Sequence, residues 1–261
     1  MIFKGIDLKE YHFENKNIVI TGAGTGYGQA LTIAFLLSDA NVFLVGRRLE
    51  KLNATIQMAN EIKKIKSMAY PIKCDIVNSD DISLAISNIS SSKNNSIDIL
   101  INCAAVPANS SNILSDISEN QWDNMMNINL KAQWFFTKSI FNIMTNPIKR
   151  VLFFTSGAAW SNTFKFGLYN ISKAALNSLS HSLAKEYAII YPDDTISINC
   201  INPGEAKTEM NQGSHISAFE ICEMVFKILD TKKNIPNGYF FHRNGKSIRF
   251  CNTQEYNLEL E

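Results

Sequence analysis

The sequence has almost no net charge and no long hydrophobic run, and these two absences exclude several classes of protein. Its 25 basic and 24 acidic side chains leave a formal net charge of +1, without the basic excess that is usual in nucleic-acid-binding proteins. No apolar run approaches the ~20 residues that a membrane-spanning helix needs. The segment from Met1 to Phe13 mixes charged and apolar residues and lacks a signal-peptide core. We therefore expect a cytoplasmic protein that binds neither nucleic acid nor a membrane.

Cysteine and histidine are also scarce. The five cysteines are scattered, odd in number and contain no Cys-x-x-Cys pair. They give neither a disulfide framework nor a zinc motif, so we expect reduced thiols. The four histidines show no metal-ligand spacing. We predict no metal site.

The chain is long enough and apolar enough to bury a substantial core. It has 261 residues, of which 46% are hydrophobic, and this length suits one large α/β domain or two small ones. We find no internal repeat and no linker rich in proline or glycine. The sequence therefore predicts a single domain over residues 1–261.

Short apolar runs alternate with helix-length segments along the chain. The predicted strands are Asn17–Thr21, Asn41–Val45, Ala69–Lys73, Ile97–Cys103, Arg150–Thr155, Thr195–Ile201 and Gly238–Phe241. The predicted helices are Gly26–Ser38, Leu49–Lys64, Asp80–Ser90, Glu119–Asn146, Leu168–Ile190 and Ala218–Asp230. Nearly continuous apolar strands are typical of parallel strands that are buried on both faces. The alternation predicts an α/β fold, a Rossmann-type doubly wound parallel sheet of about seven strands.

A glycine-rich turn directly follows the first predicted strand. It reads Thr21-Gly22-Ala23-Gly24-Thr25-Gly26-Tyr27-Gly28, and a helix-like segment begins at Gly26. Strand, turn and helix in this order are the context that a dinucleotide site requires. The glycines let the backbone approach a pyrophosphate, and the helix N-terminus offers free N–H groups and partial positive charge.

Three further sequence motifs belong with the glycine-rich turn. Asn129 lies in Asn127-Ile128-Asn129-Leu130, and Ser156 lies thirteen residues before Tyr169 in Tyr169-Asn170-Ile171-Ser172-Lys173. Together with the glycine turn, and over about residues 17–208, they resemble the short-chain dehydrogenase/reductase family in its compact single-domain branch. The resemblance implies an enzyme that moves a hydride between a nicotinamide cofactor and a carbonyl or alcohol. It also implies a cofactor half at about 1–150 and an active-site and substrate half at about 151–261.

The predicted catalytic residues are Asn129, Ser156, Tyr169 and Lys173. A proton donor for a carbonyl needs a pKa closer to neutral than the ~10 of a free phenol. Tyr169 and Lys173 are four residues apart and share a helix face, so we expect the ammonium to favour the phenolate. Ser156 ends a parallel strand, where ligands bind in such sheets, and its hydroxyl would hydrogen-bond the substrate oxygen. The resemblance implies that Asn129 anchors a water linked to Lys173, and that Lys173 also holds the nicotinamide ribose.

The resemblance extends to the cofactor contacts. It implies that Asp75 contacts the adenine, that Asn102 supports the strand and the cofactor loop, and that the loop after Asn202-Pro203-Gly204 lies under the nicotinamide carboxamide. The predicted cofactor-binding residues are Gly22, Thr25, Gly26, Tyr27, Gly28, Arg47, Arg48, Asp75, Ile76, Asn102, Ala104, Tyr169, Lys173, Pro203, Gly204, Ala206 and Thr208. Asp75 could equally be a helix N-cap, since aspartate is favoured there.

The end of the second predicted strand favours NADP(H). An NAD site usually places an acid there for the ribose 2′-hydroxyl, but this chain reads Gly46-Arg47-Arg48. A guanidinium fits a 2′-phosphate through paired charge-assisted hydrogen bonds. NAD(H) is the alternative cofactor, and a solvated helix start is the alternative interpretation of the two arginines.

One motif departs from the family pattern. The family usually shows Asn-Asn-Ala-Gly where this chain has Asn102-Cys103-Ala104-Ala105. Ala105 places a methyl group where the family has a close backbone approach. We therefore expect cofactor binding to survive and the nicotinamide riboside pocket to be altered.

The substrate is the least determined part. The segment Glu209–Ser217, where the family has its lid, is short, which indicates an open cleft for a large or polar small-molecule substrate. The segment Phe240–Phe250 carries three cations, which could meet a substrate phosphate or carboxylate or could be a solvated tail. The resemblance implies a homodimer or homotetramer through the helices that bear Asn129 and Tyr169.

Three functions stay open at this point. The first is an NADP(H)-dependent carbonyl reductase or alcohol dehydrogenase. The second is a cofactor-binding sensor or scaffold without turnover, although such proteins usually lose the active-site tyrosine or lysine. The third is a sugar epimerase or dehydratase on the same fold, although these relatives are usually longer after the position of Thr208.

Overall fold

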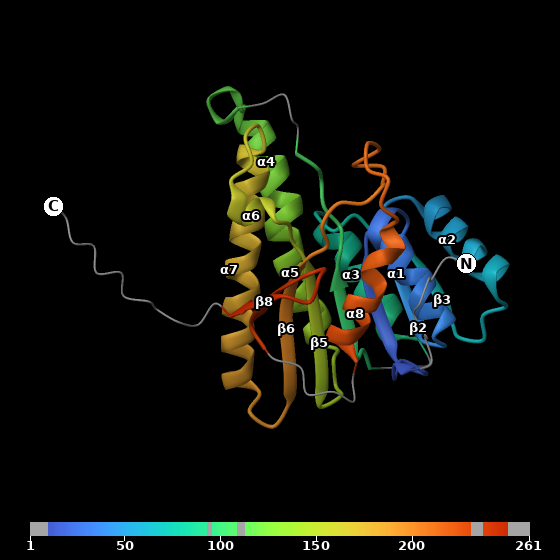
Figure 1. The fold of residues 1–261 in the computed structure, drawn as a ribbon. Coiled ribbons are helices and arrows are strands. Elements are labelled where there is room, and N and C mark those ends of the chain that lie inside the picture. Colours follow the sequence, from blue (N-terminus) through green and yellow to red (C-terminus); the bar gives the residue numbers. More distant parts are fainter. Residues whose placement is uncertain (1–9, 93–95, 109–112, 231–236, 250–261) are drawn as a thin grey trace.

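A twisted sheet with helices on both faces makes up the computed structural model, which describes residues 10–92, 96–108, 113–230 and 237–249 (Figure 1). Eight strands are ordered β3-β2-β1-β4-β5-β6-β7-β8. They are β1 (Asn17–Thr21), β2 (Asn41–Gly46), β3 (Ala69–Lys73), β4 (Ile99–Asn102), β5 (Ile148–Phe154), β6 (Thr195–Asn202), β7 (Tyr239–His242) and β8 (Ser247–Arg249). Neighbouring strands run parallel except β7 and β8, which are antiparallel.

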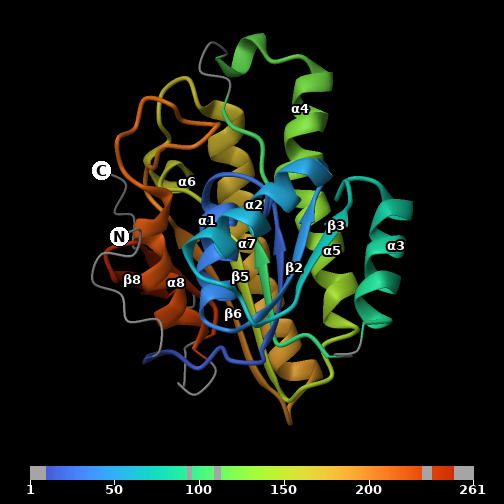
Figure 2. The same ribbon diagram turned by 90° about the vertical axis from the view of Figure 1, so that its right-hand side faces the viewer.

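The helices form two layers, one on each face of the sheet (Figure 2). One layer contains α1 (Gly26–Leu37), α2 (Leu49–Ile62), the 3₁₀ turn η4 (Ala218–Ile221) and α8 (Cys222–Leu229). The other contains α3 (Ser79–Ser90), α4 (Glu119–Met126), the π-helical turn η3 (Asn127–Lys131), α5 (Ala132–Phe141) and α7 (Gly167–Ile190). Two short elements, η2 (Leu114–Asp116) and α6 (Ala158–Ser161), lie in the connections. No helix in the described ranges has the length and apolar character to cross a membrane.

Two hydrophobic cores lie between the sheet and its helix layers. Successive residues of a strand point to opposite faces, so Ile18 and Ile20 of β1 join the core under α1 and α8, while Val19 joins the core under α5 and α7. All five residues of β1 are buried. This burial on both faces explains why the central strands consist almost entirely of apolar residues.

The chain reverses its direction of travel across the sheet beside β1. It moves outward from β1 to β2 and β3, and then returns to pair β4 with the other side of β1. The helices that follow β1 and β4 therefore leave a crevice at the carboxyl ends of these two strands. This crevice is the usual ligand position in doubly wound sheets. The fold places the glycine turn after β1 at this point.

The predicted fold class is confirmed, and each predicted strand lies within two residues of an observed one. Within the described residues the sheet has eight strands rather than about seven, because β8 extends it beyond β7. Its sequence, Ser-Ile-Arg, has no apolar run. Antiparallel pairing with β7 forms this strand, and that pairing leaves no signal in so short a segment.

The predicted long helix Glu119–Asn146 is wrong in its interior and at its end. A π-helical turn separates α4 from α5, and α5 ends at Phe141. The backbone N–H groups of Thr145 and Asn146 donate to the Ser96 hydroxyl at 3.2 and 3.1 Å instead of continuing a helix. Asn146 also precedes Pro147, a position where helical geometry is disfavoured.

Candidate active site

A cavity of about 560 Å³ opens at the carboxyl ends of the strands, on both sides of the reversal beside β1. Its wall combines the turn after β1 with the ends of β2 to β6. The sequence-predicted residues that line it are Gly22, Thr25, Gly26, Tyr27, Arg47, Arg48, Asp75, Ile76, Ala104, Ser156, Tyr169, Lys173, Pro203, Gly204, Ala206 and Thr208. The fold thus brings segments from both halves of the chain to one site.

Three predicted residues, Gly28, Asn102 and Asn129, are absent from this wall. A Cβ atom on Gly28 would lie 2.3 Å from the Gly22 carbonyl oxygen, so this glycine lets α1 pack against the turn. Asn102 is buried, and its side-chain amide donates to the Thr137 hydroxyl at 2.8 Å. These positions support the cavity from behind.

The turn after β1 forms a cradle that larger residues would fill. Gly22 has a φ of +69°, and a Cβ atom there would lie 3.0 Å from the backbone of Ala104. The Thr21 hydroxyl accepts hydrogen bonds from the N–H groups of Cys103 and Ala104 at 3.1 and 3.2 Å, which ties the turn to the loop after β4. The N-cap residue Thr25 does not cap α1 with its side chain. This cradle and the exposed helix N-terminus fit the pyrophosphate of a dinucleotide.

Ser156, Tyr169 and Lys173 meet on one side of the cavity. Ser156 follows β5, and the other two lie one turn apart on α7. The Tyr169 hydroxyl is hydrogen-bonded to the Ser156 side chain. The Lys173 ammonium donates to the Phe154 carbonyl at 2.9 Å and lies 5.6 Å from the centroid of the Tyr169 ring.

Burial dominates the protonation of this cluster. It raises the pKa of Tyr169, and the hydrogen bond from Ser156 offsets the rise only in part. Burial also lowers the pKa of Lys173 to about 8. The sequence predicted the opposite direction for Tyr169, through stabilisation of its phenolate by Lys173. Loss of solvation is the largest influence on the pKa of Tyr169, and it outweighs the hydrogen bond from Ser156.

Asn129 occupies the π-helical turn and connects three parts of the structure. It is fully buried. Its side-chain oxygen accepts from the N–H of Val106 at 2.8 Å, and its amide lies 3.2 Å from both the Val106 carbonyl and the Ser172 hydroxyl. Asn129 therefore fixes the loop after β4 against α7, at the residue that precedes Lys173.

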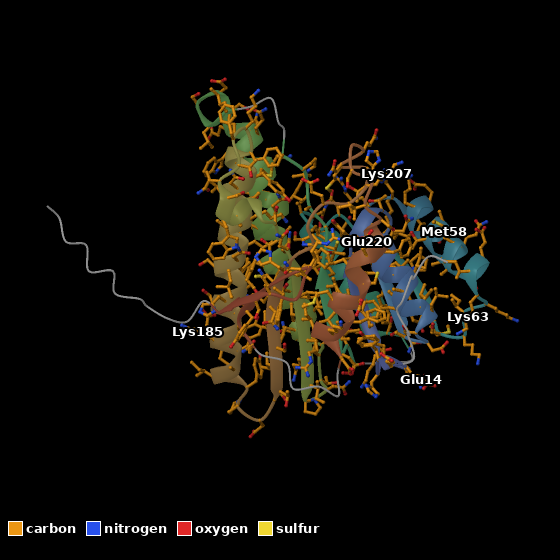
Figure 3. All side chains as sticks on the ribbon, viewed as in Figure 1. Glu14, Met58, Lys63, Lys185, Lys207 and Glu220 are labelled. Carbon is orange, nitrogen blue, oxygen red and sulfur yellow. The ribbon has the colours of Figure 1, made fainter. Side chains whose placement is uncertain are left out.

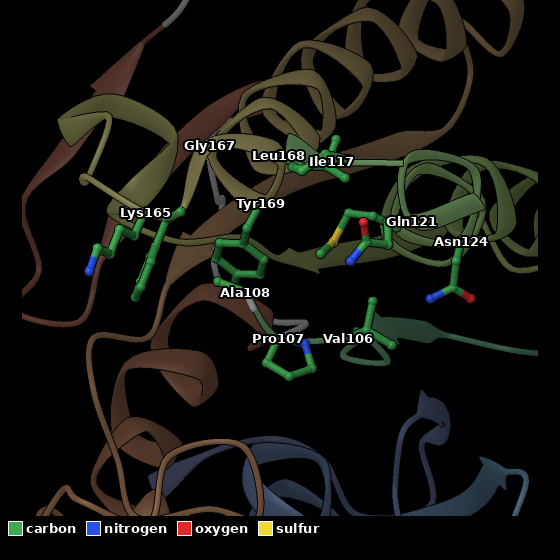
Figure 4. A pocket seen from close by; sticks show the side chains of 12 residues that line it. Val106, Pro107, Ala108, Ile117, Gln121, Asn124, Lys165, Gly167, Leu168 and Tyr169 are labelled. Atoms are coloured by element: carbon green, nitrogen blue, oxygen red, sulfur yellow. The ribbon is translucent and has the colours of Figure 1, made fainter. Parts of the chain in front are cut away.

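A second cavity of about 200 Å³ adjoins the first at Val106, Pro107 and Tyr169. Gln121 and Asn124 from α4 and Lys165 before α7 also line it. Figure 4 shows the Tyr169 ring between Lys165 on one side and Gln121 on the other. The Tyr169 side chain thus borders both cavities, one of which is rich in glycine and cations and the other of which has a mixed polar and apolar wall.

Sequence reasoning missed three charged residues in the wall of the large cavity, Lys51, Glu205 and Glu209. The Glu209 carboxylate lies 2.8 Å from Arg48 Nη2 and 3.2 Å from Lys51 Nζ. Lys51 follows Arg48 by three residues on a helix, and this spacing could have indicated a shared face. No sequence signal connects Glu209 to them, because it comes from the loop after β6.

Contacts within the protein explain one of the three cations in the segment Phe240–Phe250, which is Arg243. Arg243 forms an ion pair with Glu220 at 2.7 Å and donates to the Glu205 carbonyl at 3.1 Å. Its stem packs over Gly204, where a Cβ atom would lie 2.5 Å from Arg243 Cδ. Arg243 therefore supports the loop after β6, and Lys246 is exposed. The third predicted cation, Arg249, has its side chain outside the described residues.

Comparisons with known proteins identify the family of the chain. The family model described as short chain dehydrogenase matches residues 16–217. An uncharacterised oxidoreductase of Staphylococcus epidermidis is 27% identical over 202 residues, which cover 77% of this chain and 82% of the relative. The 3-oxoacyl-[acyl-carrier-protein] reductase of Buchnera aphidicola is also 27% identical, over 90% of this chain and 92% of its own.

Solved structures show the same fold. A dehydrogenase/reductase from Sinorhizobium meliloti superposes with a TM-score of 0.79 at 21% identity, over 90% of this chain and 96% of its own. A proposed NAD(P)-dependent gluconate 5-dehydrogenase from Beutenbergia cavernae, with NADP bound at low occupancy, has a TM-score of 0.77 at 18% identity. That match covers 88% of this chain and 95% of the other.

Proposed function

The chain belongs to the short-chain dehydrogenase/reductase family of oxidoreductases, and on that premise we propose an NADP(H)-dependent reduction of a carbonyl, or the reverse oxidation of an alcohol. The observation that carries this proposal is the meeting of Ser156, Tyr169 and Lys173 beside a cavity that fits a dinucleotide. Tyr169 borders the adjoining smaller cavity as well. A substrate carbonyl held there would be within reach of the phenol.

Tyr169 serves as the general acid in this proposal. Its raised pKa keeps the phenol protonated at neutral pH, which is the form that a general acid requires, but it also weakens the acid, because general acid catalysis is most efficient when the pKa lies near the operating pH. The Ser156 hydroxyl, already bonded to Tyr169, orients the same oxygen. The nicotinamide cofactor supplies or accepts the hydride when it is bound. Lys173, with its pKa near 8, would stabilise the phenolate after the proton has left and would hold a ribose hydroxyl.

The preference for NADP(H) rests on the charges at the end of β2. Arg47, Arg48 and Lys51 line the cavity there, and guanidinium and ammonium groups are suited to a 2′-phosphate. The structural relative with bound NADP supports the same cofactor class. NAD(H) remains the second candidate. We also propose the division into a cofactor half at about 1–150 and a substrate half at about 151–261.

A polar small molecule is the substrate class that the second cavity favours. Its wall offers the amides of Gln121 and Asn124 and the ammonium of Lys165 among apolar side chains. Hydroxyl and carboxylate groups would find donors there. A sugar-like carbonyl compound fits this description better than a fully apolar one. The cytoplasmic location and the homodimer or homotetramer stay predictions from the sequence.

Fluorescence titration of the purified protein with NADPH, and separately with NADH, tests the proposal. We expect tighter binding of NADPH, followed by turnover in a panel of carbonyl compounds that includes keto-sugars. Tighter binding of NADH would overturn the cofactor assignment and favour an oxidising dehydrogenase. Binding of neither nucleotide, or binding without turnover of any carbonyl, would favour the sensor or scaffold instead.

A further inference from the structure

Glu209 forms an ion bridge across the adenine end of the large cavity. One carboxylate oxygen lies 2.8 Å from Arg48 Nη2 and the other lies 3.2 Å from Lys51 Nζ. Arg48 precedes α2 and Lys51 lies in its first turn, while Glu209 comes from the loop after β6. Figure 3 locates the two segments that the bridge joins, with Lys207 labelled on the loop and Met58 on α2. One carboxylate thus forms ion pairs with two of the three cations that are proposed to bind a 2′-phosphate.

A tight turn presents Glu209 at this position. The backbone N–H groups of Thr208 and Asn211 donate to each other's carbonyl oxygens at 3.1 and 3.2 Å, with Glu209 between them. Farther along the loop, Lys207 N–H donates to the Ile216 carbonyl at 2.8 Å. Thr208 also packs against the glycine turn, because a Cβ atom on Gly26 would lie 3.2 Å from its methyl group. Backbone hydrogen bonds therefore fix the loop that carries the carboxylate.

The charge at Glu209 is fully developed at neutral pH. Hydrogen bonds from Arg48 and Lys51 hold the pKa of its carboxyl below the ordinary value. All three side chains are about half exposed, at 49% for Glu209, 52% for Arg48 and 44% for Lys51. Solvent-exposed pairs of this kind are weak, so a dianionic phosphate could displace the carboxylate. Displacing the carboxylate would reduce the binding free energy of a ligand that carries the phosphate. A ligand without the phosphate would not incur this cost.

We propose that Glu209 is a specificity-determining residue of the cofactor site, where its carboxylate competes with a ribose 2′-phosphate for Arg48 and Lys51. The end of β2 lacks the acid that disfavours a 2′-phosphate in NAD sites, and the loop after β6 brings an acid to the same place. Glu209 therefore limits the preference for NADP(H) over NAD(H). This inference rests on the proposed dinucleotide function.

Two ligands that differ only in the 2′-phosphate isolate this effect from the nicotinamide end of the site. Isothermal calorimetry would compare adenosine 2′,5′-bisphosphate with adenosine 5′-monophosphate on the wild-type protein and on Glu209→Gln. We expect the variant to bind the bisphosphate about three- to tenfold more tightly, as expected for the loss of two weak competing ion pairs, and the monophosphate unchanged. The gain should shrink at high salt, because salt screens exposed charges.

Glu50→Gln is the matched control. Glu50 is exposed and adjacent to Lys51 in sequence, but it does not line the cavity. Glu50→Gln removes the same charge near the first turn of α2, and we expect it to change bisphosphate binding less than about twofold. An equal gain in Glu50→Gln would reduce the effect to net charge and would overturn the proposal, as would unchanged or weaker bisphosphate binding in Glu209→Gln.

Arg48→Ala separates failure of this inference from failure of the proposed function. If the wild-type protein prefers the bisphosphate and Arg48→Ala loses that preference, the NADP(H) assignment stands whatever Glu209→Gln does. If the wild-type protein shows no preference but Glu209→Gln acquires one, the role of Glu209 stands and the NADP(H) preference fails. If neither protein distinguishes the two ligands, both statements are overturned.

Discussion

The Lys173 ammonium lies 5.6 Å from the centroid of the Tyr169 ring, and one hydrogen bond to the Phe154 carbonyl holds it there. Lys173 is only 1% exposed. Burial disfavours the charged form of both side chains, since it raises the pKa of Tyr169 and lowers the pKa of Lys173. The pair therefore keeps a neutral phenol beside a lysine that can lose its charge in the weakly alkaline range.

Replacement of Tyr169 by phenylalanine should remove turnover and spare cofactor binding. The substitution deletes the hydroxyl that is bonded to Ser156 and leaves the ring that lines both cavities. General acid catalysis is worth about 10²- to 10⁴-fold, so we expect kcat to fall by at least about 100-fold. NADPH affinity, measured by fluorescence, should change little. Tyr187→Phe, farther along α7 and outside both cavity walls, should retain turnover, and retained turnover in Tyr169→Phe would contradict the mechanism.

Replacement of Lys173 by methionine should stabilise the cofactor-free protein at neutral pH. The folded-state pKa is about 8 against an ordinary 10.5, so between these values the unfolded chain binds more protons and stability rises with pH. Below pH 8 the wild-type protein must bury a charge, at a cost on the order of 3 kcal/mol. Lys173→Met removes that cost. Its advantage in free energy of unfolding should therefore be largest below pH 8 and disappear toward pH 10.5.

Lys185→Met is the control for that measurement. Lys185 lies on the same helix but is exposed (Figure 3). Its substitution should therefore change the free energy of unfolding in urea by less than about 0.5 kcal/mol, both below pH 8 and toward pH 10.5. A Lys173→Met protein that is less stable than wild type at pH 7 would contradict the assigned burial cost.

Gly28→Ala should destabilise the protein even though Gly28 lies in a helix, where alanine is usually favoured. The added Cβ atom would lie 2.3 Å from the Gly22 carbonyl oxygen, so α1 or the turn must move. We expect a loss of at least about 2 kcal/mol in free energy of unfolding, together with weaker nucleotide binding. Gly213→Ala, where the added Cβ atom would have its nearest neighbour at 3.8 Å, should change unfolding by less than about 1 kcal/mol. Equal effects at the two glycines would exclude a steric cause.

Ala105→Gly should tighten binding of the complete cofactor. Ala105 lines the large cavity, and its methyl group stands where the family pattern has glycine. Relief of a crowded contact is worth about 1 kcal/mol or more, which corresponds to roughly fivefold in NADPH affinity. Adenosine 2′,5′-bisphosphate does not reach the nicotinamide end and should bind unchanged. Equal effects on both ligands would move the influence of Ala105 away from the nicotinamide.

The sequence predicts those features of the fold that are determined by local patterns of residues. Strands such as Asn17–Thr21 are apolar because they are buried on both faces, and the glycine turn is fixed by backbone conformations near Gly22 that other residues rarely adopt. The sequence does not predict β8, because its pairing with β7, rather than its composition, makes it a strand. The sequence also does not predict the Arg48–Glu209 contact, because loop geometry brings together residues that are far apart in the chain. The pKa direction at Tyr169 depends on burial, which the spacing of Tyr169 and Lys173 does not reveal.

The π-helical turn Asn127–Lys131 shifts the phase of the helix that contains it. A π turn closes on the fifth rather than the fourth residue, and each α-helical residue advances about 100° around the axis. The extra residue therefore rotates α4 relative to α5, compared with an uninterrupted α-helix. Met125 borders the smaller cavity, while Phe136 and Ile140 belong to the core beneath the sheet. Deletion of one residue from this turn would rotate α4 relative to α5 by about 100°, so the length of this segment is constrained independently of its composition.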